Sequence, residues 1–190
     1  RGSASTRPGS CTRPSPPPLA EHTLDLGDTL LTARLPTGGN TWPRLSARRQ
    51  KARHQYRYWL EHLAWNALGT GGDSHIHYAD GDEQLHALPA KDAAEQLHTW
   101  LAVRRSAQQQ LWLAPIELMP AYLDNLNKKD GADKNRLLIH KWIDDDQNKA
   151  DSGELWRHLW RGNETILADH IAAALTTYAP LLQPWLDHRA

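Results

Sequence analysis

RLSARRQKARHQYRYWLEHLAWNALG, residues 44–69, is the stretch that decides the fold, because it carries the longest helical pattern in the chain. One apolar stripe recurs along it at the spacing of a helix face. Ser46 is the predicted N-cap, and Gly69 follows the predicted last turn. The stripe consists of Ala52, Tyr56, Trp59, Leu60, Leu63 and Ala67. We expect it to face the core.

A second pair of aromatic residues lies on the other side of this predicted helix. Tyr58 and Trp65 are seven positions apart, which places them on one face, roughly opposite the stripe. The helix therefore either packs on two sides or offers a second face to another subunit. We interpret Tyr58 and Trp65 as partner contacts.

The first half of the stretch is strongly basic. Residues 44–57 contain no acid, and residues 1–60 hold ten Lys and Arg against three Asp and Glu. Cations at the start of a helix are repelled by the helix dipole unless an anion is near, and a phosphate backbone supplies that anion. A solvated face or an acidic protein neighbour is the alternative. The six cations are Arg44, Arg48, Arg49, Lys51, Arg53 and Arg57.

The bulk composition fits one globular domain with a tail. The chain has 190 residues with 39% hydrophobic content, and no apolar run reaches the roughly 18 residues of a membrane span. Its one cysteine, Cys11, excludes a disulfide framework within the chain, so we expect a reducing, cytoplasmic setting. The chain begins at Arg1 without a secretory h-region, so we expect a C-terminal portion of a longer protein.

The predicted class is α/β (α+β), with a small mixed sheet of hairpins flanked by helices and a helical C-terminal half. Residues 1–20 are predicted to be a disordered Pro/Ser/Arg-rich tail or linker, and residues 21–190 the domain. Strands are expected at 22–26 and 29–35 around a Gly27-Asp28 turn, at 41–44 on an edge, and in a type I′ hairpin around Asp80-Gly81. Further helices are expected at 91–109, 117–126, 134–143 and from about 163, with a kink or break at Pro180.

Two groups of side chains resemble metal ligands, and we interpret both as solvated. The first comprises His75 and His77 with Asp73, Asp80 and Asp82, and the second comprises Asp144, Asp145, Asp146, Asp151 and Glu154. His140 and His158 are interpreted as packing or surface residues. No nucleotide-binding or hydrolase motif is present, so any ATP must bind another chain or another part of the protein.

The order of two strands, a short third strand, a basic helix and more strand is similar to the PD-(D/E)xK nuclease core. Within that group the chain resembles the C-terminal domain of the exodeoxyribonuclease V gamma subunit (RecC) over residues 22–186, whereas residues 1–18 do not resemble it. The segments that carry the resemblance are LDLGDTLLTARL, the central stretch with WLEHL, the connector LWLAPIEL, the turn HLWRGNE and the ending APLL.

Active relatives hold Mg²⁺ with carboxylates on the second and third strands, together with a lysine. This chain departs from that pattern, since residues 30–35 have no carboxylate and residues 41–45 offer Trp42, Pro43 and Arg44. The resemblance therefore implies a non-catalytic domain without its own cofactor. It also implies a complex with alpha and beta subunits that carry ATP and Mg²⁺, acts on double-stranded DNA ends and recognises the Chi sequence.

Two other interpretations stay open. The chain is an active nuclease if its carboxylates come from unexpected positions such as Asp25, Asp28 and Glu61. It is a pure protein-interaction module if the basic residues meet protein and not DNA.

Overall fold

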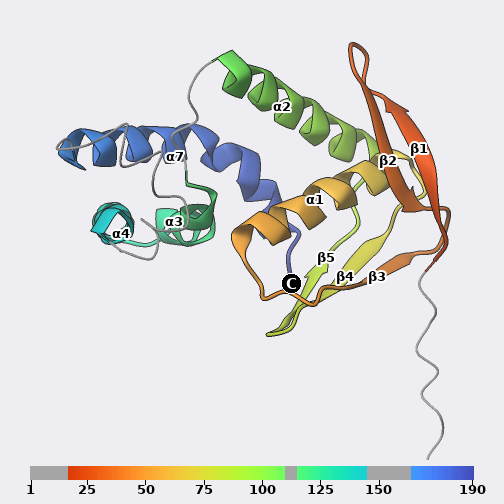
Figure 1. Cartoon of the computed structure of the whole chain (residues 1–190), viewed down its shortest axis with the longest axis horizontal. Helices are drawn as coiled ribbons and strands as arrows, with labels where there is room; N and C mark the ends of the chain where they lie inside the picture. Colours follow the sequence, from red (N-terminus) through yellow and green to blue (C-terminus); the bar gives the residue numbers. More distant parts are fainter. Residues whose placement is uncertain (1–16, 110–114, 145–163) are drawn as a thin grey trace, which may run out of the picture.

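The computed structural model describes residues 17–109, 115–144 and 164–190. The predicted tail up to residue 16, with Cys11, lies outside the described residues. The strands are β1 (Leu19–Asp25), β2 (Leu30–Pro36), β3 (Thr41–Leu45), β4 (Asp73–His77) and β5 (Asp82–Leu85). The helices are α1 (Ala52–Ala67), α2 (Ala90–Gln109), the 3-10 helix η1 (Ile116–Leu118), α3 (Met119–Leu126), α4 (Gly131–Asp144) and α7 (Glu164–Asp187). Figure 1 shows α1 near the centre, with the strands on one side and the other helices grouped above and beside it.

The first hairpin is confirmed. β1 and β2 pair antiparallel, and the Leu26 N–H donates to the Thr29 carbonyl at 3.0 Å, which leaves Gly27-Asp28 as the turn. Gly27 has φ 82°, the left-handed value that a Gly-X turn requires at its first position. The turn chemistry read from the sequence therefore holds in the structure.

The strands form two sheets and not the single mixed sheet that the sequence predicted. β1 and β2 make a sheet of their own, while the second sheet has the order β3-β4-β5. β3 is an edge strand, as Pro43 predicts, and it runs parallel to β4 with α1 as the crossover. The second sheet is thus mixed, since β4 and β5 are antiparallel.

The turn between β4 and β5 is centred one residue earlier than predicted. The Tyr78 N–H donates to the Gly81 carbonyl at 2.8 Å, so Ala79-Asp80 forms the turn. Neither Asp80 nor Gly81 has a positive φ, so the predicted type I′ geometry is wrong.

Helix α1 ends where the sequence predicts but begins later. Gly69 follows it with φ 76°, whereas the N-cap is Lys51 and not Ser46. The Ser46 N–H instead donates to the His77 carbonyl at 2.8 Å and so extends the strand ladder past Leu45. Hydrogen bonds to β4 and to the turn after it therefore override helix propensity in residues 46–51.

α1 packs on two sides, which confirms one branch of the prediction. Ala52, Tyr56, Trp59 and Leu63 of the stripe are buried. Trp65 is fully buried as well, edge-on to Trp42 with 5.6 Å between the ring centroids. The expectation of Trp65 as a surface contact therefore fails, because β3 covers it.

A buried histidine on α1 forms hydrogen bonds with β4 of the second sheet and with the segment after β5. The His62 ring lies 2.8 Å (Nδ1) from the Ser74 hydroxyl and 3.0 Å (Nε2) from the His86 carbonyl. A carbonyl only accepts, so Nε2 carries the proton and Nδ1 accepts from Ser74. Burial lowers the pKa of His62 to about 4.

The C-terminal half is helical in its described part, as predicted. α7 continues through Pro180 and Pro184, so of the predicted kink or break at Pro180 the break is wrong and the kink stays a prediction. The chain then returns to β5, where Arg189 forms an antiparallel bridge with Leu85. No helix among the described residues has the length and hydropathy of a membrane span. The nuclease-like core stays a prediction.

Candidate nucleic-acid interface

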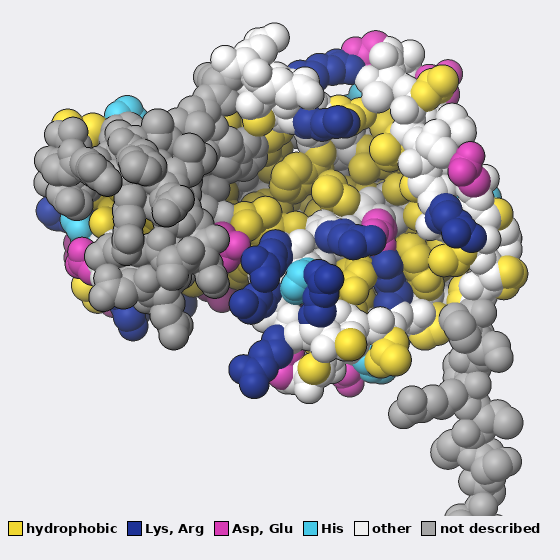
Figure 2. Space-filling model, viewed as in Figure 1, with side chains coloured by type: hydrophobic (Ala, Val, Ile, Leu, Met, Phe, Trp, Pro, Cys, Tyr) yellow, Lys and Arg dark blue, Asp and Glu magenta, His cyan; other side chains and the backbone are white. Residues whose placement is uncertain are grey.

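The six predicted cations occupy one region but three different elements. Arg44 lies on β3, Arg48, Arg49 and Lys51 lie in the connection to α1, and Arg53 and Arg57 lie in the first turns of α1. All except Arg44 are exposed. Figure 2 shows Lys and Arg side chains gathered near a histidine on one face of the molecule. We call the four cations at positions 48, 49, 51 and 53 the basic loop.

Arg44 and Arg57 differ from the basic loop because they share an acid. Both form ion pairs with Glu61, and the bond from Arg57 Nε to Glu61 Oε1 measures 2.9 Å. The Arg44 guanidinium also lies 4.2 Å from the ring centre of Trp42 and 4.3 Å from that of Tyr58. Arg44 is thus held by cation–π contacts and a half-buried carboxylate. The Arg44 guanidinium is therefore engaged within the domain, and one ring face of Tyr58 contacts it.

The backbone of the basic loop is fixed to the tip of the β4-β5 hairpin. Ala79 donates its N–H to the Arg48 carbonyl at 3.1 Å, and the Gln50 N–H donates to Asp80 Oδ1 at 2.7 Å. Ser46 Oγ accepts the Arg48 N–H at 3.4 Å. These bonds hold the main chain while the side chains extend into solvent. The cations are therefore preorganised at their Cα positions.

The start of α1 adds a second source of positive potential. The Lys51 side chain makes no capping hydrogen bond, and the first turn holds no acid. The first N–H groups of a helix and its dipole attract anions. The pKa of His54 is lowered by burial first and then by Arg48, Arg53, Lys51 and Arg57. His54 lies inside the basic run, but no pattern in the sequence distinguished it.

A family model described as the RecC C-terminal domain matches residues 5–127. This chain belongs to the RecC C-terminal domain family. It is accordingly a domain of the exodeoxyribonuclease V gamma subunit, which works with other subunits in DNA repair and recombination. A search of curated proteins gave no match.

The range of the family match corrects the boundaries expected from the sequence. It begins at residue 5, inside the segment that we took to lie outside the family, and it includes the basic loop and all of α1. It stops at residue 127, so the turn HLWRGNE and the ending APLL lie beyond the matched part.

The three acids named for the alternative of an active nuclease of the same fold make other contacts. Asp25 Oδ1 accepts the Gly27 N–H at 2.9 Å. Asp28 Oδ2 pairs with Arg105 Nη1 of α2 at 2.7 Å, and this bond lowers the pKa of Asp28. Glu61 is shared by two arginines. Within the described ranges, no three or more His, Cys, Asp and Glu side chains are placed to hold a metal ion.

The acids near His75 and His77 point to separate partners. Asp73 Oδ1 accepts the Ala87 N–H at 2.9 Å, and Asp73 Oδ2 lies 3.6 Å from His86 Nδ1. Asp82 Oδ1 lies 3.0 Å from His77 Nδ1. Of the other candidate group, only Asp144 is described, since residues 145–163, with His158, lie outside the described residues.

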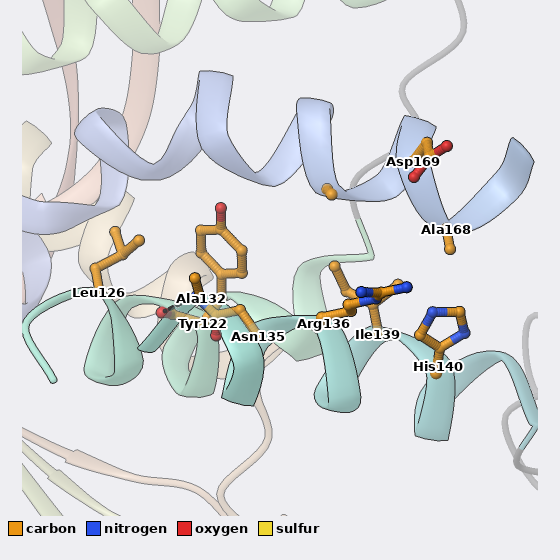
Figure 3. A pocket seen from close by; sticks show the side chains of 10 residues that line it. Tyr122, Leu126, Ala132, Asn135, Arg136, Ile139, His140, Ala168 and Asp169 are labelled. Carbon is orange, nitrogen blue, oxygen red and sulfur yellow. Dashed lines mark hydrogen bonds between the residues drawn. The ribbon is translucent and has the colours of Figure 1, made fainter. Parts of the chain in front are cut away.

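A cavity of about 640 Å³ lies between α3, α4 and α7, away from the basic loop. Figure 3 shows Tyr122 reaching up from α3 toward α7, and Arg136 and His140 on α4 below Asp169. Tyr122 Oη is 2.7 Å from Thr176 Oγ1, which ties α3 to α7. His140 lines this cavity and is exposed, so it is a surface residue.

Proposed function

We propose that this domain is a non-catalytic part of the gamma subunit, and that its basic loop contacts the sugar-phosphate backbone of the DNA that the complex processes. The partner alpha and beta subunits supply the ATP-driven motors and the Mg²⁺-dependent nuclease. The domain's own share is to guide DNA and to contact those subunits.

The observation that carries this proposal is the contrast within the basic cluster. Arg44 and Arg57 share the carboxylate of Glu61, whereas Arg48, Arg49, Lys51 and Arg53 are exposed beside an uncapped helix start without an acid. Such a surface is unfavourable alone and favourable next to phosphate. The fixed loop backbone lowers the ordering cost of binding.

The test is DNA binding by the assembled complex in which Arg48, Arg49 and Arg53 of this domain are changed to Glu. Each lost phosphate contact on duplex DNA reduces the slope of log affinity against log salt by about 0.9, so we expect a reduction of about 2 to 3. Fluorescence anisotropy over a salt series measures this slope. The matched control changes Arg34, Arg104 and Lys129, three exposed cations elsewhere, to Glu.

The same variants separate DNA contact from protein contact. An unchanged salt slope, combined with loss of the partner subunits on size-exclusion chromatography, would show that the basic loop meets an acidic protein surface. An unchanged slope in an intact complex would refute both contacts. Asp25, Asp28 and Glu61 are engaged in other bonds, and these contacts favour the non-catalytic alternative over an active nuclease.

A further inference from the structure

The groove between α2 and α7 carries negative charge, in contrast to the basic loop. It forms a cavity of about 410 Å³, within the roughly 300 to 1,000 Å³ of most ligand sites. Asp92 and Glu95 of α2 line it, and both are exposed. Among the described residues, no Lys, Arg or His lines this groove. Its charge therefore attracts a cation.

Both carboxylates are available to a partner. Asp92 lies in the first turn of α2, where the helix dipole favours its charged form. Glu95 has a long ion pair with Lys91, 3.8 Å apart, and water screens it because the two side chains are 66% and 85% exposed. Asp92 and Glu95 are three positions apart, so they lie on one face of the helix. One guanidinium group, with its planar set of five N–H donors, can therefore bind both.

The other walls of the groove favour arginine over lysine. Trp100 of α2 and Pro180, Leu181 and Pro184 of α7 supply apolar surface. A guanidinium plane is weakly hydrated and stacks on an indole, whereas an ammonium group is a compact and strongly hydrated charge. An indole beside two carboxylates therefore suits an arginine side chain.

Two buried polar atoms in the groove wall indicate that the arginine belongs to a polypeptide. Trp100 Nε1, a donor, and Gln96 Oε1, an acceptor, are buried without a hydrogen-bond partner, and both residues line the groove. Such unpaired groups are unfavourable. A peptide backbone offers a carbonyl for the indole and an N–H for the amide oxygen, after small rotations of the two side chains. A metal ion or a protonated polyamine offers the indole no acceptor.

We propose that the groove between α2 and α7 receives an arginine in an extended segment of another subunit of the complex. The arginine lies at Asp92 and Glu95, with its guanidinium plane against Trp100. The adjoining backbone pairs with Trp100 Nε1 and Gln96 Oε1. This inference gives a chemical identity to one of the subunit contacts in the proposed function, and it rests on those contacts and not on the contact of the basic loop with DNA.

Photocrosslinking in the assembled complex tests the occupant. Thr99 is exposed and lines the groove, and it is replaced by p-benzoylphenylalanine, which reacts under ultraviolet light with C–H bonds within its reach. We expect an adduct with the alpha or beta subunit, next to an arginine of that subunit. The same replacement of Asp124, exposed on α3, is the matched control and should not give this adduct. An adduct on the gamma subunit itself, on DNA or away from any arginine would overturn the proposal.

Charge variants test the assigned contacts. Asp92→Asn combined with Glu95→Gln keeps the shape of both side chains and should lower the adduct yield about five-fold, equivalent to about 1 kcal/mol. Glu95→Lys should lower the yield as well, and changing the cross-linked arginine to Glu in that variant should restore it. Asp124→Asn is the control and should leave the yield unchanged.

The outcomes separate this inference from the proposed function. An adduct yield that the neutral pair of variants leaves unchanged would overturn the arginine contact. No adduct at position 99 in a complex that still elutes as one species would overturn the groove contact alone and leave the other subunit contacts in place. A normal adduct together with an unchanged salt slope in the basic-loop variants would support the groove contact and overturn the DNA contact.

Discussion

Replacing Glu83 by Gln should destabilise the domain more than the same replacement at any exposed Glu. Glu83 is 3% exposed on β5 and accepts hydrogen bonds from Tyr78 Oη at 2.8 Å and Trp185 Nε1 at 3.2 Å. Gln55 Nε2 at 3.5 Å and Arg189 Nε at 3.4 Å complete the set of donors. One carboxylate on β5 therefore joins α1, the turn after β4 and the C-terminal end of α7.

The size of the effect follows from these contacts. Gln keeps one acceptor oxygen but turns an amide N–H₂ toward groups that donate, so at least one charge-assisted bond is lost, worth about 1.5 to 3 kcal/mol. Breaking a fully buried ion pair costs about 3 to 5 kcal/mol. The pair between Glu83 and Arg189 should cost less, because the Arg189 side chain is 34% exposed and water screens its charge. We expect a loss of about 2 to 4 kcal/mol in the free energy of unfolding. For a domain of this size that corresponds to roughly 5 to 15 °C in Tm.

Calorimetry or circular dichroism measures this change, with Glu21→Gln on the exposed face of β1 as the matched control. A second measurement is the ionisation of Tyr78, whose pKa is raised by burial first and by Glu83 next. Removing the carboxylate charge should therefore lower the pKa of Tyr78. If Glu83→Gln melts within about 2 °C of the Glu21→Gln control, the buried network does not join these elements, and the reasoning is refuted.

Three further predictions follow from the described contacts. In the folded domain His62 has a pKa of about 4, whereas in the unfolded chain it takes up a proton near pH 6.5. The free energy of unfolding should therefore fall by about 3 kcal/mol as the pH drops from 6.5 to 4. Urea unfolding over that pH range measures the loss, and His62→Gln should flatten it. Changing Arg48 and Arg53 to Glu should raise the pKa of His54 in an NMR titration, because after burial these two cations contribute most to lowering it. An unchanged pKa would place the basic loop away from His54. Gly72→Ala should destabilise the domain, because an added Cβ meets the backbone of Asn40, whereas Gly38→Ala, with open space around it, should cost under about 1 kcal/mol in the same melting assay.

Local chemistry was enough to predict several elements. Gly27 and Gly69 fix the first turn and the end of α1, because each needs a positive φ. Pro43 marks β3 as an edge strand, because it cannot donate to a second neighbour. These signals lie in one or two residues and do not depend on the rest of the chain.

The remaining features depend on partners distant in sequence. The local sequence predicts Ser46 as an N-cap, but its N–H donates to the carbonyl of His77, 31 positions later. The helical pattern alone predicts Trp65 on the surface, but Trp42 on β3 covers it and Trp65 is buried. Glu83, about which the sequence made no prediction, is buried where the chain end returns to β5. Each miss therefore reflects tertiary pairing that local propensity does not contain.

The same tertiary pairing explains why the basic loop is suited to binding. Had residues 47–51 been helical, as the sequence predicted, their cations would have pointed in different directions around the helix axis. Pairing with β4 and the hydrogen bond from Gln50 to Asp80 hold them instead in one fixed connection at the uncapped start of α1. The acids nearby are used to hold the backbone, as with Asp80, or to neutralise Arg44 and Arg57, as with Glu61. The remaining positive charge lies where hydrogen bonds hold the main chain, and this arrangement supports the phosphate contact that we propose.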